Sequence, residues 1–489
     1  MSKIYKGLAY SAFSQNISHV ISIASTVVIA RLLTPDELGI FAIAATINLM
    51  TAQLKAFGTG TYLVREKELN LMTVRNALGL SILISWSLGL LLLFSSSFIA
   101  QYYAKHDIGL LIKVLSLGFF LTPHTSIGEA LMIRDFFFGR IFAARLTGQI
   151  IQFSLVVVFI IAGYSYFSIA YAAAIGATVE LIIVIFLRTK DFVFFPKFNN
   201  LKSLFKFGVY TTAAGLLDRT SSHLSDLIIG KLGTSAEVAY FSRGLGFLSF
   251  ITTTVESTVR PVITPYLADK NRDGSSVGKS YLFASKLIGA LAIPALAVAG
   301  YASTPIIEVF FGHQWGRSAE LVTILCYWAV IRFVHVLTPP LFIIYRLEKF
   351  LFWKEVFIAI NYAIVIYSFF PFGLKAIAFG MIGVAIVNFI IVSILQKSFI
   401  NLTFKEQFSN ILPNIYITIF CVSWAVLVDY LINFKSINAF YSVAVLCPST
   451  IVVWYFSLIF TKHPLLQEII IMIQKIKQGI SAKILKQDI

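Results

Sequence analysis

The sequence predicts an all-α polytopic membrane protein of about 14 transmembrane helices, in two pseudo-symmetric six-helix lobes around a central hydrophilic cavity, with a further C-terminal helix pair. Three observations lead to this prediction. The chain of 489 residues is 58% hydrophobic and only 13% charged, which is not the composition of an ordinary soluble protein. Apolar runs long enough to cross a bilayer recur along its whole length. A short sequence motif, called the repeated phrase below, and the stripe of polar residues before it recur 200 residues later in the chain.

The apolar runs exceed about 20 residues and lack period-2 alternation, which argues against a membrane β-barrel. The expected spans are residues 10–33, 38–63, 77–100, 108–132, 141–163, 166–187, 205–230, 237–262, 281–305, 320–345, 351–370, 376–396, 411–432 and 438–460. The least distinct boundaries are the short break at 163–165 and the region near 370. The N-terminus lacks a small-residue cleavage pattern, so we expect it to be retained.

The distribution of basic residues predicts the orientation in the membrane. With the N-terminus in the cytoplasm, 26 of the Lys and Arg residues fall in cytoplasmic segments and 6 on the opposite side. This bias follows the positive-inside rule and predicts a multi-pass membrane protein with both termini cytoplasmic. The net charge of +16 is therefore attributed to topology and contact with membrane lipids. Nucleic-acid binding is not expected, because the basic residues are dispersed over many loops.

This topology can be tested with reporter fusions. We expect reporters in residues 65–75, 188–206 and 270–286 to be cytoplasmic and a reporter in 232–236 to be external, because the first three segments carry the basic residues. Paired alkaline phosphatase and fluorescent protein fusions measure this. An external signal from 188–206 would overturn the lobe boundary and the parallel repeat with it.

The repeated phrase is ARLLTPDELGIF at residues 30–41 and GKLGTSAEVAYF at residues 230–241. Six expected spans separate the copies, an even number, so both have the same orientation in the membrane. This is a parallel repeat, as in transporters built from two related halves. It predicts an N-lobe over 1–195 and a C-lobe over 196–400, followed by an additional helix pair over 401–461. Ile and Leu alternate with Lys at helical intervals after that pair, which predicts a basic amphipathic cytoplasmic tail over 462–489.

A polar stripe precedes each copy of the phrase. The first span carries Ser11, Ser18, His19, Ser22, Ser25 and Thr26, and the matching positions 200 residues later are Thr211, Asp218, Arg219, Ser222, Ser225 and Asp226. Small polar residues also allow helices to pack closely, and the serines of the first span could have this role instead. Charges at mid-span cost about 2.5–3.5 kcal/mol each on insertion scales. Asp218, Arg219 and Asp226 therefore favour a central hydrophilic cavity.

Other charges within the spans leave alternatives open. Lys55 could line the cavity or reach the cytoplasmic headgroups. Arg243, which glycines flank, begins the eighth span. Glu256 and Arg260 are four residues apart and could pair on one helix, whereas Arg332 and His335 could line the cavity or pair locally. The remaining acidic residues are isolated near span ends, where we expect interfacial placement: Glu129, Glu180 and Glu308.

Motifs for catalysis are scarce. The chain contains no GxxxxGK[ST], HExxH or GxSxG, and its short outer loops leave no room for a folded catalytic domain. The sequence thus predicts a transporter rather than an enzyme. It calls for no cofactor and no metal, and it leaves ion or proton coupling open.

The phrase ARLLTPDELGIFAIA after a polar first helix, followed by LKAFGTGTYLVREKE, resembles the polysaccharide-transport branch of the multidrug/oligosaccharidyl-lipid/polysaccharide exporter superfamily. That branch includes O-antigen and exopolysaccharide repeat-unit flippases, with the lipid II flippase a more distant relative. The resemblance covers the whole chain, and its specific motifs lie in residues 5–70 and 201–245. It implies two six-helix lobes around a central cavity and, as in many members, two further helices.

The resemblance further implies a function. It implies transfer of an undecaprenyl-diphosphate-linked oligosaccharide from the cytoplasmic to the outer leaflet by alternating access, in O-antigen, capsule or exopolysaccharide synthesis, with polymerase and chain-length proteins as potential pathway partners. A cation-coupled multidrug exporter of the same superfamily is the alternative, in which Asp218 and Asp226 would hold the cation.

The resemblance also places individual residues. Arg31 matches the arginine that ends the family's first helix, and Arg243 matches a cavity arginine of the lipid II flippase. Lys55 stands where that relative has cavity arginines. The pair Asp218 and Arg219 has no assigned counterpart. The candidate substrate-binding residues are Arg31, Lys55, Asp218, Arg219, Asp226, Arg243 and Arg332.

Overall fold

The chain folds into α-helices that form two compact units, and we describe it from a computed structural model. The described residues are 2–55, 59–66, 69–199, 201, 205, 223–272, 276–434, 436–471 and 474, although side chains are described from residue 17 onward and with a few gaps in 258–272. The first unit is Met1–Ser242 and the second is Arg243–Ile489. The first four residues of the second polar stripe and most of the seventh expected span lie outside the described residues; the four are Thr211, Asp218, Arg219 and Ser222.

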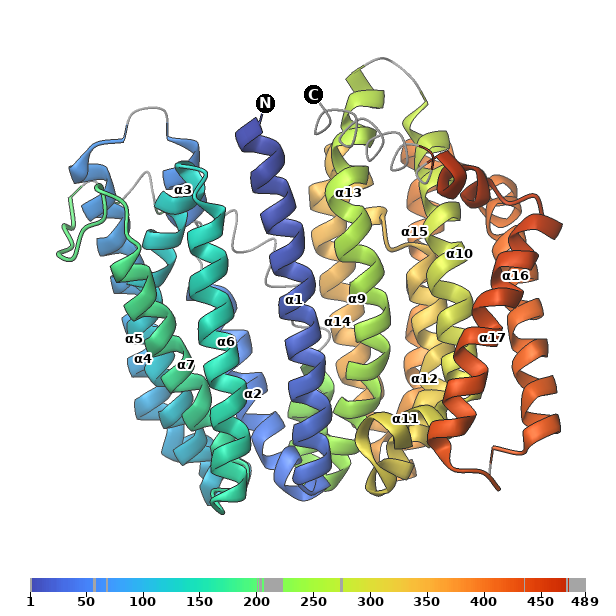
Figure 1. Ribbon diagram of the computed structural model, residues 1–489, viewed down its shortest axis with the longest axis horizontal. Helices are drawn as coiled ribbons and strands as arrows, with labels where there is room; N and C mark the ends of the chain where they lie inside the picture. The colour runs from blue at the N-terminus through green and yellow to red at the C-terminus, as the bar shows by residue number, and fades with distance from the viewer. Residues whose placement is uncertain are drawn as a thin grey trace, which may run out of the picture. The chain divides into compact units, whose positions relative to one another are not determined.

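The first unit is a helical bundle in which α4, α5, α7 and α6 lie side by side and consecutive helices run in opposite directions (Figure 1). Helix α1 packs against α6, and α2 packs against α5. The helices of this unit are α1 (Ser2–Leu32), α2 (Pro35–Lys55), α3 (Thr59–Arg65), α4 (Leu71–Tyr102), α5 (His106–Arg134), α6 (Phe138–Ile161) and α7 (Phe167–Phe186), and α9 (Ser235–Arg272) begins in it. The expected break at 163–165 is present, because Gly163 takes a positive φ of 89° between α6 and α7.

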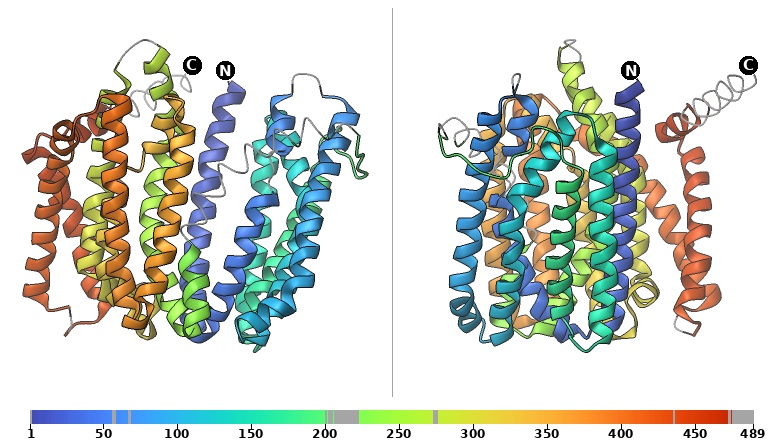
Figure 2. Two further views of the ribbon diagram at one scale, coloured as in Figure 1. Left: turned by 180° about the vertical axis from the view of Figure 1, so that it is seen from behind. Right: turned by 60° about the vertical axis from the view of Figure 1, so that its left-hand side comes forward.

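The second unit is built around α10, which packs against α12 and α16. Figure 2 shows α16 and α17 as an antiparallel pair beside α10. The helices of this unit are the rest of α9, α10 (Val277–Tyr301), α11 (Ser303–Phe311), η1 (His313–Trp315), α12 (Gly316–Val334), α13 (Thr338–Ile344), α14 (Glu348–Phe369), η2 (Phe370–Phe372), α15 (Leu374–Ile400), α16 (Phe404–Ile432) and α17 (Ala439–Phe460).

The membrane character of the fold is confirmed. Within the described part of the chain, 11 helices are long and apolar enough to cross a bilayer. Their outward faces carry large apolar side chains such as Phe94, Phe186 and Phe460, each at least 77% exposed, as expected where lipid replaces water. The count of 14 and the arrangement of the lobes stay predictions.

One expected span proves to be two helices. The run at 320–345 was expected to be continuous, but α12 ends at Val334 and α13 begins at Thr338. Pro339 and Pro340 cause the interruption, because proline has no N–H to donate to the preceding turn and its ring clashes with that turn. The span is therefore a broken helix whose interruption lies at residues 335–337.

The repeated phrase is a helix start used twice. In the first copy, Glu37 Oε2 accepts hydrogen bonds of 2.8 Å from both the N–H and the Oγ1 of Thr34, and the Glu37 N–H donates back to Thr34 Oγ1. Thr234 and Glu237 repeat this arrangement at the start of α9, with distances of 2.8, 3.1 and 3.2 Å. This is a capping box, which satisfies N–H groups at the helix N-terminus. The internal repeat therefore preserves the capping box as well as the amino-acid pattern.

Candidate functional site

The two copies of the phrase contact each other within the first unit. Asp36 Oδ1 accepts a 3.2 Å hydrogen bond from the N–H of Ala236, at the N-terminus of α9 where the helix dipole favours a carboxylate. Gly39 lies so close to Ser235 that a Cβ on Gly39 would fall 1.7 Å from the Ser235 carbonyl oxygen. We call Asp36, Gly39, Ser235 and Ala236 the outer clamp, because the predicted topology places them on the outer side.

Charged side chains surround the outer clamp. Lys105, in the turn between α4 and α5, interacts with the carboxylates of Asp36 and Glu237. Burial lowers the pKa of Lys105, and these two carboxylates oppose the shift. Lys231 donates a 2.5 Å hydrogen bond to the Tyr102 carbonyl and lies 4.2 Å from the centre of the Tyr102 ring. The clamp therefore rests on a scaffold of ionic and cation–π contacts.

Lys55, at the last position of α2, turns toward α5. Its Nζ donates a 3.0 Å hydrogen bond to Thr122 Oγ1 and lies 4.9 Å from the centre of the Phe119 ring. Both contacts are with uncharged groups of the bundle rather than with a carboxylate in hydrogen-bond range. The ammonium is therefore held in place without a hydrogen-bonded counter-ion.

The structure brings together charges that the sequence analysis separated. Glu129 on α5 makes a bidentate ion pair with Arg145 on α6, with Nε–Oε1 at 2.6 Å and Nη2–Oε2 at 2.8 Å. The expectation that Glu129 is isolated is wrong. Sequence reasoning missed Arg145, although a guanidinium within an apolar span indicates a partner, because an unpaired charge there is costly.

Glu180 on α7 completes the group. Its carboxylate interacts electrostatically with Lys55, Glu129 and Arg145. Glycines allow the close approach of α6 and α7 at this point, since a Cβ on Gly148 would lie 3.2 Å from Glu180 Cβ. Lys55, Glu129, Arg145 and Glu180 form the four-charge cluster, which has two cations and two carboxylates contributed by four helices. The expectation of isolated placement is therefore wrong for Glu180 as well.

Asp226 is buried and hydrogen-bonded to a residue of α2 in the first unit. It is 6% exposed, accepts a 2.9 Å hydrogen bond from Thr46 Oγ1 on α2, and lies 3.9 Å from His223 Nδ1. In this structure the carboxylate joins the helical residues 223–232 to α2. A role in lining a hydrophilic path stays a prediction.

The cationic candidates of the second unit lie against aromatic rings. The Arg243 guanidinium is 5.2 Å from the ring centres of both Phe311 and Trp315. Arg332, in the last turn of α12, lies 5.3 Å from the Trp328 ring. Guanidinium groups stack favourably on aromatic faces, which holds the cation without neutralising it.

The remaining residues considered in the sequence analysis belong neither to the outer clamp nor to the four-charge cluster. Arg31 is exposed in the last turn of α1, where a cation complements the helix dipole. His335, considered with Arg332, instead contacts Tyr281 and Ser393. Glu308 pairs with His313 at 3.1 Å and is therefore not isolated. Arg260, weighed as a partner for Glu256, lies outside the residues whose side chains are described.

Comparison with solved structures identifies the fold. The lipid II flippase MurJ in an inward closed conformation matches with a TM-score of 0.75 at 13% identity, over 95% of this chain and 100% of that one. An inward-facing multidrug resistance MATE family transporter matches with a TM-score of 0.59 at 16% identity, over 81% of this chain and 98% of that one. The chain therefore has the MurJ/MATE-like transporter fold.

Comparison of sequences identifies the family. The lipopolysaccharide biosynthesis protein WzxC of Escherichia coli is 22% identical over 350 residues, 68% of each chain. The teichuronic acid biosynthesis protein TuaB of Bacillus subtilis is 18% identical over 423 residues, 85% of this chain and 87% of the relative. A family model described as polysaccharide biosynthesis protein matches residues 28–320, more than half of the chain. The chain belongs to this polysaccharide biosynthesis protein family, which confirms the resemblance found in its sequence.

Proposed function

We propose that the protein is a flippase that moves polyprenyl-diphosphate-linked oligosaccharide repeat units from the cytoplasmic to the outer leaflet of the bacterial inner membrane. The names of its relatives support this: WzxC and TuaB act in polysaccharide biosynthesis, the succinoglycan biosynthesis transport protein ExoT is 20% identical, and MurJ shares the fold. The observation that carries the proposal is a cation inside the helical bundle, Lys55, whose hydrogen bond goes to a neutral hydroxyl.

The chemistry of the substrate explains why a cation is placed there. A diphosphate is the charged part of such a lipid, and charge-assisted hydrogen bonds to it are about twice as strong as neutral ones. Lys55 can exchange Thr122 for a phosphate oxygen at little cost, whereas Arg145 would first have to release Glu129. Lys55 is therefore the first contact for the diphosphate, and Arg145 positions the four-charge cluster around it.

Arg243 would be a further contact for the diphosphate, within the second unit. Its guanidinium lies against the rings of Phe311 and Trp315, which hold the cation without neutralising it.

The transfer would proceed by alternating access. Opening to the outside requires the outer clamp to separate, and reclosing restores the Asp36 to Ala236 hydrogen bond. The lobes that would rock are the expected segments 1–195 and 196–400, while the prenyl tail stays in lipid. The sugar chain needs a hydrophilic passage, which the polar residues of α1 would help to line.

A cation-coupled multidrug exporter is the second candidate, because a MATE transporter also matches the fold. Such a protein needs an accessible carboxylate for its cation. Asp226, one of the two carboxylates considered for this, is buried and bonded to Thr46. This weighs against the second candidate, as do the cations Lys55 and Arg243, which would repel a cationic drug.

The proposal can be tested by depleting the protein in its own host. Lipid-linked repeat units should accumulate and should be protected from a membrane-impermeant oxidant added to spheroplasts, because their sugars face the cytoplasm. Re-expression should restore their exposure. If the accumulated sugars react fully with the external oxidant, transfer does not require this protein; if no lipid-linked sugar accumulates, the protein acts before transfer.

A further inference from the structure

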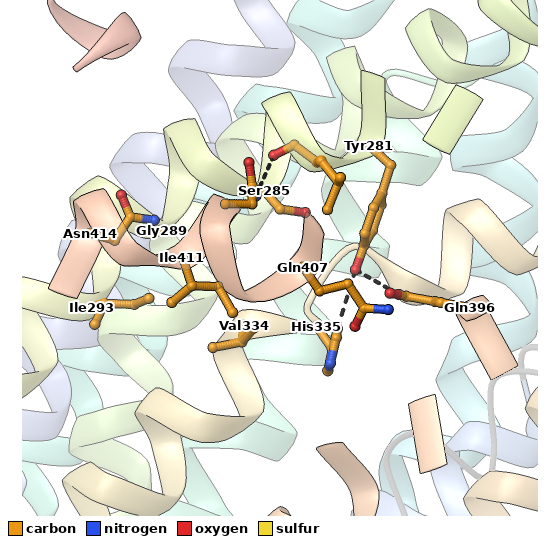
Figure 3. A pocket seen from close by; sticks show the side chains of 12 residues that line it. Tyr281, Ser285, Gly289, Ile293, Val334, His335, Gln396, Gln407, Ile411 and Asn414 are labelled. Atoms are coloured by element: carbon orange, nitrogen blue, oxygen red, sulfur yellow. Dashed lines mark hydrogen bonds between the residues drawn. The ribbon is translucent and has the colours of Figure 1, made fainter. Parts of the chain in front are cut away.

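A polar pocket lies within the second unit, among α10, α12, α15 and α16 (Figure 3). It is lined by Tyr281, His335, Gln396, Gln407 and Asn414, together with Ser285, Asn410 and apolar residues. Most of these side chains are nearly excluded from solvent, with Gln396 at 0%, Asn414 at 2% and Gln407 at 4% exposure. Three primary amides buried in a membrane protein are costly unless each polar atom has a partner.

The amide nitrogens have partners and the amide oxygens do not. Gln407 Nε2 donates to the carbonyls of Leu402 at 3.0 Å and Ser393 at 3.4 Å, which fixes the orientation of this amide because both acceptors are backbone oxygens. Asn414 Nδ2 is fixed in the same way by the Lys286 carbonyl at 3.2 Å.

Gln396 has two hydroxyl groups as partners instead of backbone carbonyls. Its Nε2 donates to Tyr281 Oη at 2.9 Å and reaches Thr338 Oγ1 at 3.5 Å. The oxygens of Gln396, Gln407 and Asn414 are shut off from solvent and have no hydrogen-bond partner. The pocket therefore offers acceptors and calls for a ligand that donates or carries positive charge.

The broken helix points to the same kind of ligand. Val334, the last residue of α12, and His335 line the pocket, at the C-terminus of a helix interrupted within the bundle. The dipole of α12 makes this end negative, and interrupted membrane helices commonly coordinate cations at such ends. Figure 3 places Gln396, Gln407 and His335 together at one end of the pocket, with Asn414 at the other.

The residues around this end constrain the ligand further. Both ring nitrogens of His335 are engaged, Nδ1 with Tyr281 Oη at 3.4 Å and Nε2 with Ser393 Oγ at 3.2 Å, so oxygen atoms remain as ligands. No carboxylate lines the pocket. The nearby Lys354 is paired with Glu355 at 2.6 Å, which offsets its repulsion. Neutral oxygen ligands suit a hard monovalent cation, whereas Ca²⁺ and Mg²⁺ generally require carboxylates.

We propose that this pocket binds a monovalent metal cation, Na⁺ or K⁺, between the amide oxygens of Gln396 and Gln407 at the negative end of α12. The ion joins α12 and α15 to α16, the first helix of the C-terminal pair, and so stabilises the docking of that pair. This site stands apart from the four-charge cluster in the first unit, and it does not depend on the proposed function.

Thermal unfolding of the full-length protein in nanodiscs tests the site. NaCl and KCl are titrated against choline chloride at constant ionic strength, and binding of radioactive ²²Na⁺ or ⁸⁶Rb⁺ is measured on the same preparation. One of the two metal cations should raise the unfolding temperature in a saturable manner, because a ligand of the folded state stabilises it by mass action. Absence of both a saturable shift and isotope binding means that the pocket holds water alone, and the proposal fails.

Two variants locate the ion. In Gln396→Glu a carboxylate can still accept from the Tyr281 and Thr338 hydroxyls, and its charge should lower the half-saturating cation concentration at least tenfold. Gln407→Leu removes one oxygen ligand and should raise that concentration at least tenfold. If Gln407→Leu does not fold, the Gln396→Glu result decides.

A matched control tests whether the conversion of any amide to a carboxylate changes cation binding, or only a conversion within the pocket. Asn361 on α14 donates its amide N–H to the Phe357 carbonyl on its own helix and does not line the pocket, so Asn361→Asp should leave cation affinity unchanged. A change in Asn361→Asp equal to that in Gln396→Glu, or unchanged affinity in Gln396→Glu, would place the ion elsewhere and overturn the proposal.

Discussion

Replacement of Lys55 by Glu is expected to reduce transport of lipid-linked sugar at least about 100-fold, while Lys55→Arg keeps most activity. Loss of one hydrogen bond to a charged group is worth about 1.5–3 kcal/mol, and each 1.4 kcal/mol is about tenfold in an equilibrium constant. A glutamate at this position would also repel the diphosphate and add a third carboxylate beside Glu129 and Glu180. Surface polysaccharide per unit of membrane-inserted protein measures the effect.

A lysine in a surface ion pair provides the control for Lys55→Glu. Lys375 pairs with Glu320 at 2.9 Å and is 61% exposed, so reversal of its charge disturbs a solvent-screened contact. Lys375→Glu should export normal amounts of polysaccharide. Normal export by Lys55→Glu would remove Lys55 from the diphosphate site and leave Arg243 and Arg332 as the next candidates.

Replacement of Gly39 by Val is expected to abolish transport by preventing closure of the outer clamp. The new Cβ would fall 1.7 Å from the Ser235 carbonyl oxygen and 2.3 Å from its carbonyl carbon, and backbone atoms cannot turn aside as a flexible side chain can. Overpacking usually costs about 1–3 kcal/mol, and here the strain is removed once the two helix starts separate. Labelling of a cysteine introduced at Ser235 with a membrane-impermeant maleimide, together with polysaccharide export, measures the outcome.

Gly139 provides the matched control for Gly39→Val. It lies in the first turn of α6, and a Cβ there would meet no atom within 4 Å. Gly139→Val should transport normally and leave labelling at position 235 low. If Gly39→Val transports like the unmodified protein, contact between the two phrases is not part of the cycle; if it is inactive but shows low labelling, loss of activity has another cause.

Local features were predictable from the sequence because they depend on neighbours along the chain. The break between α6 and α7 follows from a glycine at positive φ, and the two helix starts follow from Thr and Glu three residues apart. The interruption between α12 and α13 also has a local cause in Pro339 and Pro340, which the apolar run concealed because hydropathy does not register a missing N–H.

The candidate site was predictable only in part. Lys55 could be singled out because a charge within an apolar run is costly, but its contact with Thr122 joins two helices. Glu129 and Arg145 are 16 residues apart on different helices, and their pairing depends on which faces of α5 and α6 meet. The partnerless oxygens of Gln396 and Gln407 are likewise set by packing, since an amide has the same composition whether or not its oxygen is satisfied.

The sequence by itself determined that the chain is a helical membrane protein, where most of its helices lie and that it contains an internal repeat. These properties follow from hydropathy, charge and turn chemistry, which act over a few residues. The tertiary structure alone decided that the two repeated phrases touch, that two carboxylates and two cations from four helices share one cluster, and that three buried amides line one pocket. Such contacts join residues far apart in the chain, and they depend on the rotation and close approach of helices, which a single sequence does not specify.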